Sequence, residues 1–506
     1  MATMGNPPRD QAYRNLVVQD TFVAKRGVFQ ELFAPGALEA EQAILSHFIV
    51  GPAGVDPDDT KYTSIQAAYD AAAATGIPQI VFVRPGTYTE NLVLTTSGIT
   101  IVGLSSTFGV VLNGSVTTNT PAVTPFLPDL LLQNFHVNGD LIQSGAGLTR
   151  YESVDVTGNV SQSAGTLILY QSGNSGTVTV TGGFFRNLEG YAGNITVSGT
   201  GSVQGLDGQF QDFTSTAATA SNIIKGSILG AIAVTNGSLG VSYCNVAGSS
   251  MVCTNGTLLL IYCPSIGGGG DNRLVQPIGT GRIVMEYCVG GNNTYPNPGY
   301  RFTIAPGDVN ALIQLEFCSI SGTMDLQDGN FAAGGCDFSL APPVSGYFLQ
   351  GGAFAKFGES NIQVADRPIG PSLGYFHLAG NATLEAANSK FISKSTLFGT
   401  PVFGTESVTS LMTFRNCVLE SQTLGAIFSI NVNGLAANGL PVVNLLNCSL
   451  KSSSTPGSDW CNTAVDQVAT PPGALVGITI NTPLEGVPGY GVFPTQVTRV
   501  LLQTLV

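Results

Sequence analysis

One short pattern recurs through most of the chain and constrains its fold more than any other feature. An apolar residue is followed by a variable residue, an asparagine or aromatic residue, a cysteine or apolar residue, a variable residue and a final apolar residue. Self-similarity of this kind is typical of repeat architectures, in which each unit buries its apolar face against its neighbours. The copies begin at Leu132, Tyr151, Phe185, Phe210, Val241, Leu260, Met285, Leu315, Phe414 and Leu445.

The alternation of side chains along a strand predicts which positions of the pattern face the core. Side chains two residues apart share a face, so the first apolar residue and the asparagine or aromatic residue both face inward. The next residue, often cysteine, also faces inward, so the strand must bend between the two. An asparagine there would satisfy backbone groups freed by the bend. This interpretation stacks four aromatic residues in the core, namely Tyr243, Tyr262, Tyr287 and Phe317.

These features predict an all-β chain that folds as a right-handed single-stranded parallel β-helix with small N- and C-terminal extensions. At roughly 25 residues per coil and about 4.8 Å per rung, about 16 coils would form a rod on the order of 75 Å long. We divide the chain into an N-terminal anchor or shaft-like segment (1–50), the β-helix (51–456) and a C-terminal cap or oligomerisation segment (457–506).

One helix is expected at the start of the β-helix, over about 63–75. Thr63 to Gln66 has the form of a capping box, and Gly76 and Pro78 follow the segment. Its apolar residues have helical spacing and form one face, which consists of Ile65, Ala68, Tyr69 and Ala72.

Composition excludes several classes of protein. Charged residues are only 10% of the chain, the net charge is −13, and no cluster of Lys or Arg occurs, so a nucleic-acid partner is not expected. No apolar run is long enough for a membrane span. The nine cysteines form no CxxC pairs, which favours buried thiols over disulfides or a metal cluster. The first 15 residues are polar and lack an apolar signal core, so assembly in a cytoplasm is expected.

Residues 62–72, 80–94 and 99–103 resemble the entry to the pectin-lyase-like superfamily, in which a helix caps the start of a right-handed parallel β-helix. Gly86 to Glu90 also resembles the first signature of pectin methylesterases. The catalytic signatures of those esterases, of polygalacturonases and of pectate lyases are not found in this sequence. The resemblance therefore implies the fold without the best-known chemistries of the superfamily.

Residues 15–24 alternate like a strand and resemble shaft-like segments of viral fibres and tailspikes. That resemblance implies a homo-oligomer, with a trimer favoured, that contacts other virion proteins through its N-terminal segment. It also implies location in a virion, assembly in a host cytoplasm, and a glycan as a further partner.

Two groups of acidic residues are candidate sites. Glu286 and Glu316 occupy the same outward column in successive copies of the pattern, and a pair of carboxylates at that spacing suits a glycosidase. Solvated acids on a variable column are the alternative interpretation. Asp56, Asp58 and Asp59 would suit a calcium ion, or else simply precede a helix. His136 faces outward without an evident serine or cysteine partner. No cofactor is implied.

Three functions remain open on the sequence alone. The first is a structural or attachment component of a virus particle, such as a capsid-associated protein, fibre or spike. The alternative is a carbohydrate-active enzyme on the same fold, which would be a polysaccharide lyase, an esterase or a glycoside hydrolase. A cell-surface adhesion protein is the third. Fold alone does not decide between them.

Overall fold

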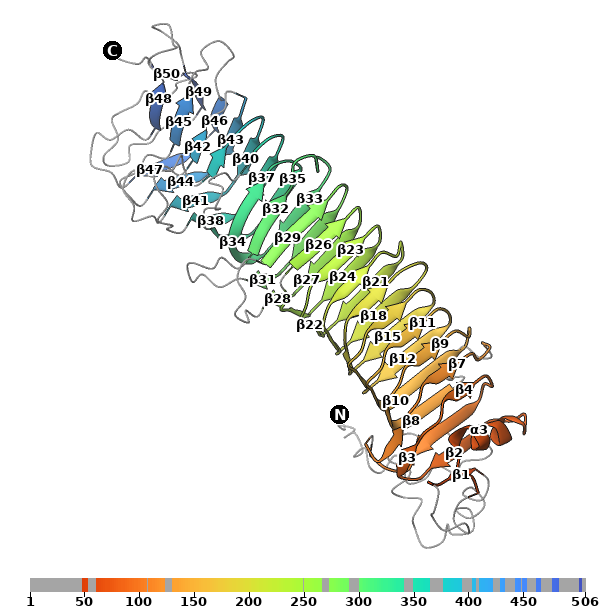
Figure 1. Cartoon of the computed structure of the whole chain (residues 1–506). Coiled ribbons are helices and arrows are strands. Elements are labelled where there is room, and N and C mark those ends of the chain that lie inside the picture. The colour runs from red at the N-terminus through yellow and green to blue at the C-terminus, as the bar shows by residue number, and fades with distance from the viewer. Residues whose placement is uncertain are drawn as a thin grey trace, which may run out of the picture.

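The computed structural model describes residues 48–52, 61–106, 108–122, 130–248, 250–265, 273–290, 300–340, 349–364, 376–393, 403–405, 409–421, 428–432, 442–446, 448–452, 461–465, 476–481 and 500–502. These residues wind into a right-handed parallel β-helix, a long rod that carries its single described helix at the N-terminal end (Figure 1). The predicted fold class, and the fold that the pectin-lyase-like resemblance implies, are therefore confirmed. No helix among the described residues is long and apolar enough to cross a membrane.

Each coil contributes strands to three faces of the rod, and every face grows by parallel pairing with the next coil. Face 1 holds the longest regular strands, most of them five residues long. Its strands are β1 (Ile49–Val50), β2 (Gln79–Val83), β5 (Ile99–Gly103), β8 (Leu130–Val137), β10 (Leu148–Val156), β12 (Thr166–Tyr170), β15 (Phe184–Leu188), β18 (Ser202–Leu206), β21 (Ala220–Ile224), β24 (Ser238–Ser242), β27 (Thr257–Ile261), β30 (Arg282–Glu286), β33 (Leu312–Glu316), β35 (Asn330–Gly334), β37 (Phe354–Gly358), β40 (Thr383–Ala387), β43 (Leu411–Arg415), β46 (Val442–Leu446) and β49 (Val476–Asn481).

Face 2 follows face 1 directly in each coil and is made of shorter strands. It comprises β3 (Gly86–Tyr88), β6 (Val110–Leu112), the second halves of β8 and β10, β13 (Gly173–Asn174), β16 (Tyr191–Ala192), β19 (Gln209–Phe210), β22 (Ser227–Ile228), β25 (Asn245–Val246), β28 (Pro264–Ser265), β31 (Val289–Gly290), the start of β34 (Ser319–Leu326), β36 (Asp337–Leu340), β38 (Asn361–Val364), β41 (Lys390–Ser393), β44 (Val418–Ser421) and β47 (Ser449–Ser452).

Face 3 closes the coil before the chain returns to face 1. It comprises β4 (Leu92–Leu94), β7 (Val116–Thr118), β9 (Leu141–Gln143), β11 (Val160–Gln162), β14 (Val178–Val180), β17 (Ile195–Val197), β20 (Phe213–Ser215), β23 (Ile232–Thr235), β26 (Ser250–Thr254), β29 (Arg273–Ile278), β32 (Tyr300–Ile304), the second half of β34, β39 (Phe376–Leu378), β42 (Phe403–Thr405), β45 (Phe428–Val432) and β48 (Cys461–Val465).

The observed register corrects part of the sequence alignment. Tyr151, which begins one copy of the pattern, pairs with Leu169, and Leu169 pairs with Asn187. The next copy therefore begins at Asn187, two residues after the predicted start at Phe185. Phe210 lies on face 2 and belongs to a different position of the coil. The shortest coils advance by only 18 residues, as between Gln171 and Glu189, which is less than the predicted average. Four of these coils bend at Gln171, Glu189, Asp207 and Lys225, with neither a cysteine nor an aromatic residue at the bend, so the pattern does not mark them.

The bend between faces 1 and 2 is made by one residue per coil in the left-handed backbone conformation. We call these residues the corner column. A left-handed conformation costs an ordinary L-residue roughly 1 to 2 kcal/mol, so the surrounding hydrogen bonds must hold it in place. The corner column consists of Asn134, Ser153, Gln171, Glu189, Asp207, Lys225, Tyr243, Tyr262, Tyr287, Phe317, Gly335, Glu359, Asn388 and Asn416, with φ between +48° and +62°.

Hydrogen bonds between coils hold each corner. The N–H of a corner residue donates to the carbonyl that precedes the corner of the next coil, as from Tyr262 to Glu286 and from Tyr287 to Glu316, both at 2.9 Å. The equivalent bond is formed by every corner residue in the part of the column that begins at Gln171 and ends at Asn416. The predicted bend is therefore confirmed, and the backbone ladder continues through it.

The aromatic corner residues face outward, so the prediction that they stack in the core is wrong. Tyr243, Tyr262, Tyr287 and Phe317 are 58%, 43%, 43% and 55% exposed. The strict alternation of a strand applies only while the backbone stays extended. A left-handed residue ends the face 1 strand and projects its side chain away from the core, and alternation starts again in the following strand.

The residue after the corner points inward and replaces a lost ladder bond. Buried cysteine or serine occupies this position in most of the later coils, and Cys288 N donates to Cys318 Sγ while Cys336 N donates to Ser360 Oγ. Each thiol or hydroxyl in turn donates to the carbonyl two residues earlier, as Cys318 does to Glu316 O at 3.3 Å. The eight cysteines whose side chains the structure describes are free and buried, as predicted, and burial raises the pKa of Cys244 to about 11.

The single described helix, α3 (Ile65–Ala73), covers the first coils through the four predicted apolar residues, all of them buried. Its N-cap is Ser64, whose Oγ accepts from Ala67 N at 3.2 Å, and not the predicted Thr63. Glu90, from the loop after β3, accepts hydrogen bonds from Ser64 Oγ, Ile65 N and Gln66 N at 2.7 to 3.0 Å. A carboxylate 25 residues away therefore completes the cap, which local sequence rules do not anticipate.

The C-terminal end of the rod differs from its middle. Parallel pairing continues beyond residue 456 to β49, which pairs with β46. The short strand β50 (Val500–Leu502) then pairs antiparallel with β49. The domain boundaries at 50 and 456 stay predictions, and the shaft-like residues 15–24 lie outside the described part of the chain.

We expect Glu90→Gln to lower the free energy of unfolding by about 1 to 2 kcal/mol. A neutral amide accepts weaker hydrogen bonds and removes the negative charge at the start of α3. Thermal melting followed by circular dichroism measures the change. Glu189→Gln is the matched control, because its carboxylate accepts one exposed bond from Gln171. Equal effects of the two substitutions would contradict the role of Glu90.

At the position after the corner, Cys318→Val is expected to destabilise the rod by about 1 to 3 kcal/mol, because it leaves the buried Cys288 N–H without an acceptor. Cys318→Ser should stay within about 1 kcal/mol of the native protein, since serine already fills this position at Ser360 and Ser389. Melting temperatures of the two variants test this order, and a more stable valine variant would refute it.

Candidate functional site

A groove opens on the rod where small residues replace large ones on face 1 and at the corner. On the three coils that follow Glu316, the residues in register with it are Gly334, Gly358 and Ala387. The corner residue that follows Phe317 is Gly335. The resulting depression has a volume of about 430 Å³. It is lined by Gln314, Leu315, Glu316, Phe317, Ala332, Ala333, Gly334, Gly335, Lys356, Gly358, Glu359, Ala387 and Asn388.

One wall of the groove carries a carboxylate that is held in place. Gln314 Nε2 donates to Glu316 Oε1 at 2.7 Å, and both side chains are half-buried. Glu286 pairs with Glu316 in register on the preceding coil, so the two predicted acids do lie on adjacent rungs. Only Glu316 lines the groove, and Glu286 stands one rung behind it.

The opposite wall carries both signs of charge. Lys356 and Glu359 are exposed and come from β37 and the corner that follows it, two coils beyond Glu316. Asn388 lies at the next corner, where its Oδ1 accepts from Asn416 Nδ2 at 3.0 Å. Lys356, Glu359 and Asn388 are not among the site residues predicted from the sequence. No acidic motif marks them, and they meet only through the stacking of coils.

The floor of the groove is supported from inside by aromatic packing. Phe357 lies between Lys356 and Gly358 and points into the core. Its ring centroid is 5.6 Å from that of Phe331 and 5.7 Å from that of Phe391. A floor of backbone and small side chains over packed rings resists collapse, so the depression persists without a ligand.

The ring of Phe317 forms the upper end of the groove. One side of the ring packs against Tyr287, with centroids 5.2 Å apart, and the other side lies over Gly335. A Cβ atom at Gly335 would come within 2.7 Å of Phe317 Cδ1, and the backbone there has φ +62°. Other corners hold ordinary residues in this conformation, so glycine is required at this corner by the position of the ring, and it also removes the conformational cost.

The four outward aromatic corner residues stack on one another and form what we call the aromatic ladder. Ring centroids are 5.1, 4.7 and 5.2 Å apart from Tyr243 through Tyr262 and Tyr287 to Phe317, and the planes lie within 14° of parallel. In-register parallel pairing places equivalent residues one rung apart, which accounts for the spacing. The ladder ends at the groove.

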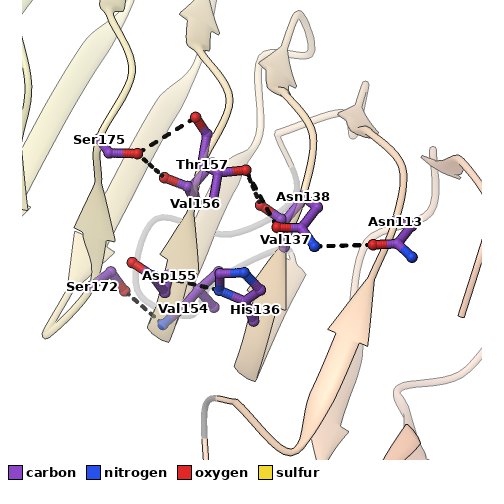
Figure 2. A network of polar contacts seen from close by, with 10 residues as sticks. All are labelled: Asn113, His136, Val137, Asn138, Val154, Asp155, Val156, Thr157, Ser172 and Ser175. Atoms are coloured by element: carbon purple, nitrogen blue, oxygen red, sulfur yellow. Dashed lines mark hydrogen bonds and ion pairs between the residues drawn. The ribbon is translucent and has the colours of Figure 1, made fainter. Parts of the chain in front are cut away.

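A second polar cluster lies near the N-terminal end, on face 2. His136 Nδ1 and Asp155 Oδ2 are 2.8 Å apart on adjacent coils (Figure 2). The ring of Phe108 packs against the imidazole, with centroids 5.3 Å apart. Nearby, Asn138 Nδ2 donates to Asn113 Oδ1, and Thr157 and Ser175 donate to backbone carbonyls of neighbouring coils. These bonds tie successive coils together, and among the described residues no serine, threonine or cysteine side chain is bonded to the His136–Asp155 pair.

A buried acid occurs on face 3. Asp325 is 6% exposed, and Arg301 Nη2 lies 3.7 Å from its Oδ2. Burial raises the pKa of the Asp325 carboxyl, and the Arg301 guanidinium opposes this shift. The pair lies in β32 and β34, away from the groove lining.

The predicted metal site is not described by the structure, because Asp56, Asp58 and Asp59 lie outside its described residues. Within the described ranges, no three His, Cys, Asp or Glu side chains gather in an arrangement that could hold a metal ion.

Comparison with known proteins extends to the fold only. No protein family matches the chain, and no curated protein matches its sequence. Among solved structures, the chain is similar to the PL6 family alginate lyase AlyGC, with 9% identity over 83% of this chain and 99% of that chain and a TM-score of 0.24. It is also similar to the A-module of the Azotobacter vinelandii mannuronan C-5 epimerase AlgE6, with 10% identity, coverage of 81% and 94%, and a TM-score of 0.18.

The interpretation of the chain as a structural or attachment component of a virus particle is corrected by these findings. The solved structures above are those of a lyase and an epimerase, and no similarity to a viral fibre or spike is shown. The segment that motivated the interpretation is a short alternating stretch, a pattern that arises easily. The trimer and the virion location that accompanied it stay untested predictions.

We expect Gly335→Ala to cost about 1 to 2 kcal/mol of stability and to displace the Phe317 ring, because the added methyl group meets the ring at a left-handed backbone position. Melting temperature and near-ultraviolet circular dichroism of the aromatic ladder report the two effects. Gly334→Ala is the control, since nothing lies within 4 Å of its added Cβ. An unchanged ring signal in Gly335→Ala would contradict the packing described.

Proposed function

We propose that the protein binds a polysaccharide and hydrolyses it in the groove between Phe317 and Asn388. The observation that supports this most directly is the combination of an aromatic ring at one end of the groove with Glu316 and Glu359 on opposite walls. A sugar presents apolar C–H groups and hydroxyl groups. The C–H groups can pack against the exposed edge of the Phe317 ring, whose two faces are covered by Tyr287 and Gly335, and the hydroxyl groups can bind carboxylates and amides. Ligand sites commonly combine such an apolar surface with a few placed polar groups.

The spacing of the carboxylates favours hydrolysis with inversion. Glu316 precedes one corner and Glu359 forms the corner two coils later, so their backbones are about 10 Å apart at about 4.8 Å per rung. Inverting glycosidases place their two carboxyl groups roughly 6.5 to 9.5 Å apart, which leaves room for a water molecule. Glu316 is held by Gln314, and rotation of the exposed Glu359 side chain toward it would bring the two carboxyl groups within this range.

The roles follow from position. Glu316 is half-buried and held by Gln314, and in the proposal it protonates the oxygen of the leaving sugar. Glu359 is exposed, so water reaches it, and it removes a proton from the water that attacks the opposite face of the sugar. Lys356 lies beside Glu359 and binds substrate hydroxyls. All of these residues come from one chain, so the proposal does not depend on the predicted trimer.

The test is depolymerisation of neutral and acidic polysaccharides by the native protein and by Glu316→Gln and Glu359→Gln. Each substitution should lower kcat at least about 100-fold, because a general acid or base contributes roughly 10² to 10⁴. Glu152→Gln and Glu189→Gln are matched controls at the same two positions of distant coils, and both should retain activity.

The products distinguish the reaction types. Hydrolysis yields a new reducing end, and inversion is visible as the opposite anomer in proton NMR of the fresh product. Formation of an unsaturated sugar that absorbs ultraviolet light would show that the reaction is a lyase reaction and not hydrolysis. Full activity of the Glu316→Gln variant would show that the reaction does not take place in the groove.

A further inference from the structure

The aromatic ladder is the largest exposed aromatic feature among the described residues, and core packing does not account for it. Its four rings lie at successive corners and run parallel to the axis of the rod, along the edge between faces 1 and 2. An aliphatic or polar residue serves the corner equally well elsewhere, as Ser153 and Lys225 do. Exposed contiguous aromatic surface of this kind marks an interaction site.

The ladder is preorganised for binding. The backbone of each ring is fixed by the hydrogen bond of its corner N–H, and each inner ring is held between two neighbours at 4.7 to 5.2 Å. Little side-chain freedom remains to be lost when a ligand binds. Tyrosine also offers a hydroxyl on a rigid ring, which combines apolar contact with hydrogen bonding at low entropic cost.

The ladder is continuous with the groove. Phe317 is both its last ring and part of the groove lining. A linear glycan that occupies the groove and continues along the corner therefore passes Tyr287, Tyr262 and Tyr243 in turn. The spacing of the rings is close to the rise of one sugar unit in an extended chain, so successive units meet equivalent ring edges and hydroxyls.

The charges beside the ladder select the class of glycan. Its outward neighbours on face 1 include Glu286 and Glu316, and its neighbours on face 2 are uncharged. These neighbours are Ser242, Ile261, Glu286 and Glu316 on face 1 and Asn245, Pro264, Val289 and Ser319 on face 2, and none of them is Lys or Arg. Lys225 is the corner residue before Tyr243, at the end of the ladder away from the groove. A polyuronate would meet like charge there, on a chain of net charge −13.

We propose that the aromatic ladder binds the part of the substrate that extends beyond the groove, and that this substrate is a neutral linear polysaccharide lying along the rod. The inference rests on the proposed function and specifies its substrate class. The ladder contributes binding to long chains only, because a short oligosaccharide fills the groove without reaching Tyr262.

The test compares a neutral trisaccharide and a neutral hexasaccharide, each against the uronate of equal length, with native protein and Tyr262→Ala. We expect Tyr262→Ala to raise the KM for the neutral hexasaccharide about tenfold. The KM for the neutral trisaccharide, and kcat for both substrates, should stay unchanged. Tyr262→Phe keeps the ring and should restore most of the affinity. Phe108→Ala removes an exposed ring far from the ladder and is the control, with melting curves to verify folding.

Each outcome separates the ladder from the proposed reaction. If the native protein cleaves both lengths and Tyr262→Ala affects them equally or not at all, the ladder is not a binding site, while hydrolysis in the groove stands. Tighter binding of the uronate hexasaccharide than of the neutral hexasaccharide would contradict the proposal that the substrate is a neutral polysaccharide. A further outcome is that, in affinity electrophoresis, the native protein binds the neutral hexasaccharide more tightly than Tyr262→Ala does, without cleaving it. That result would support the ladder as a binding site and contradict the proposed hydrolysis. Neither binding nor cleavage of any of the glycans overturns both.

Discussion

The hydrogen bond donated by each left-handed corner residue to the next coil is the interaction on which the rest of the rod depends. It keeps the backbone ladder continuous through a sharp bend, and the buried thiol or hydroxyl of the following residue satisfies a neighbouring N–H. Each corner would otherwise leave polar groups unpaired beside a dry core, at a cost of about 1 to 3 kcal/mol per group. The corner bond recurs at twelve successive corners, the first at Gln171 and the last at Asn416, and it sets the register of all three faces.

The same corner also determines what the surface can do. Because the corner side chain projects outward, a run of aromatic residues becomes an exposed stack, and a run of small residues becomes a depression. Both occur within a few coils of each other, where Phe317 meets Gly335. The groove and the ladder thus arise from residue choice at single positions on an otherwise uniform scaffold, without a long loop or a second domain among the described residues.

Much of the fold was predictable, because periodic apolar residues and the N-terminal helix leave local marks in the sequence. Glu286 and Glu316 were correctly placed on adjacent rungs by the same periodicity. The outward direction of Tyr243 to Phe317 was not predictable from alternation, since alternation cannot register a left-handed residue. Glu90 and Lys356 were missed for a different reason. Their partners lie one or more coils away, and the described coils vary in length from about 18 to 35 residues.

The antiparallel strand β50 has a consequence for growth of the rod. A parallel coil stack has no intrinsic end, because its last rung offers the same unpaired edge as every rung before it. β50 runs in the opposite direction and covers part of the edge of β49 with a strand of only three residues. A short reversed strand at this edge disfavours pairing with the first rung of a second rod, and so opposes end-to-end growth into a fibre at this face.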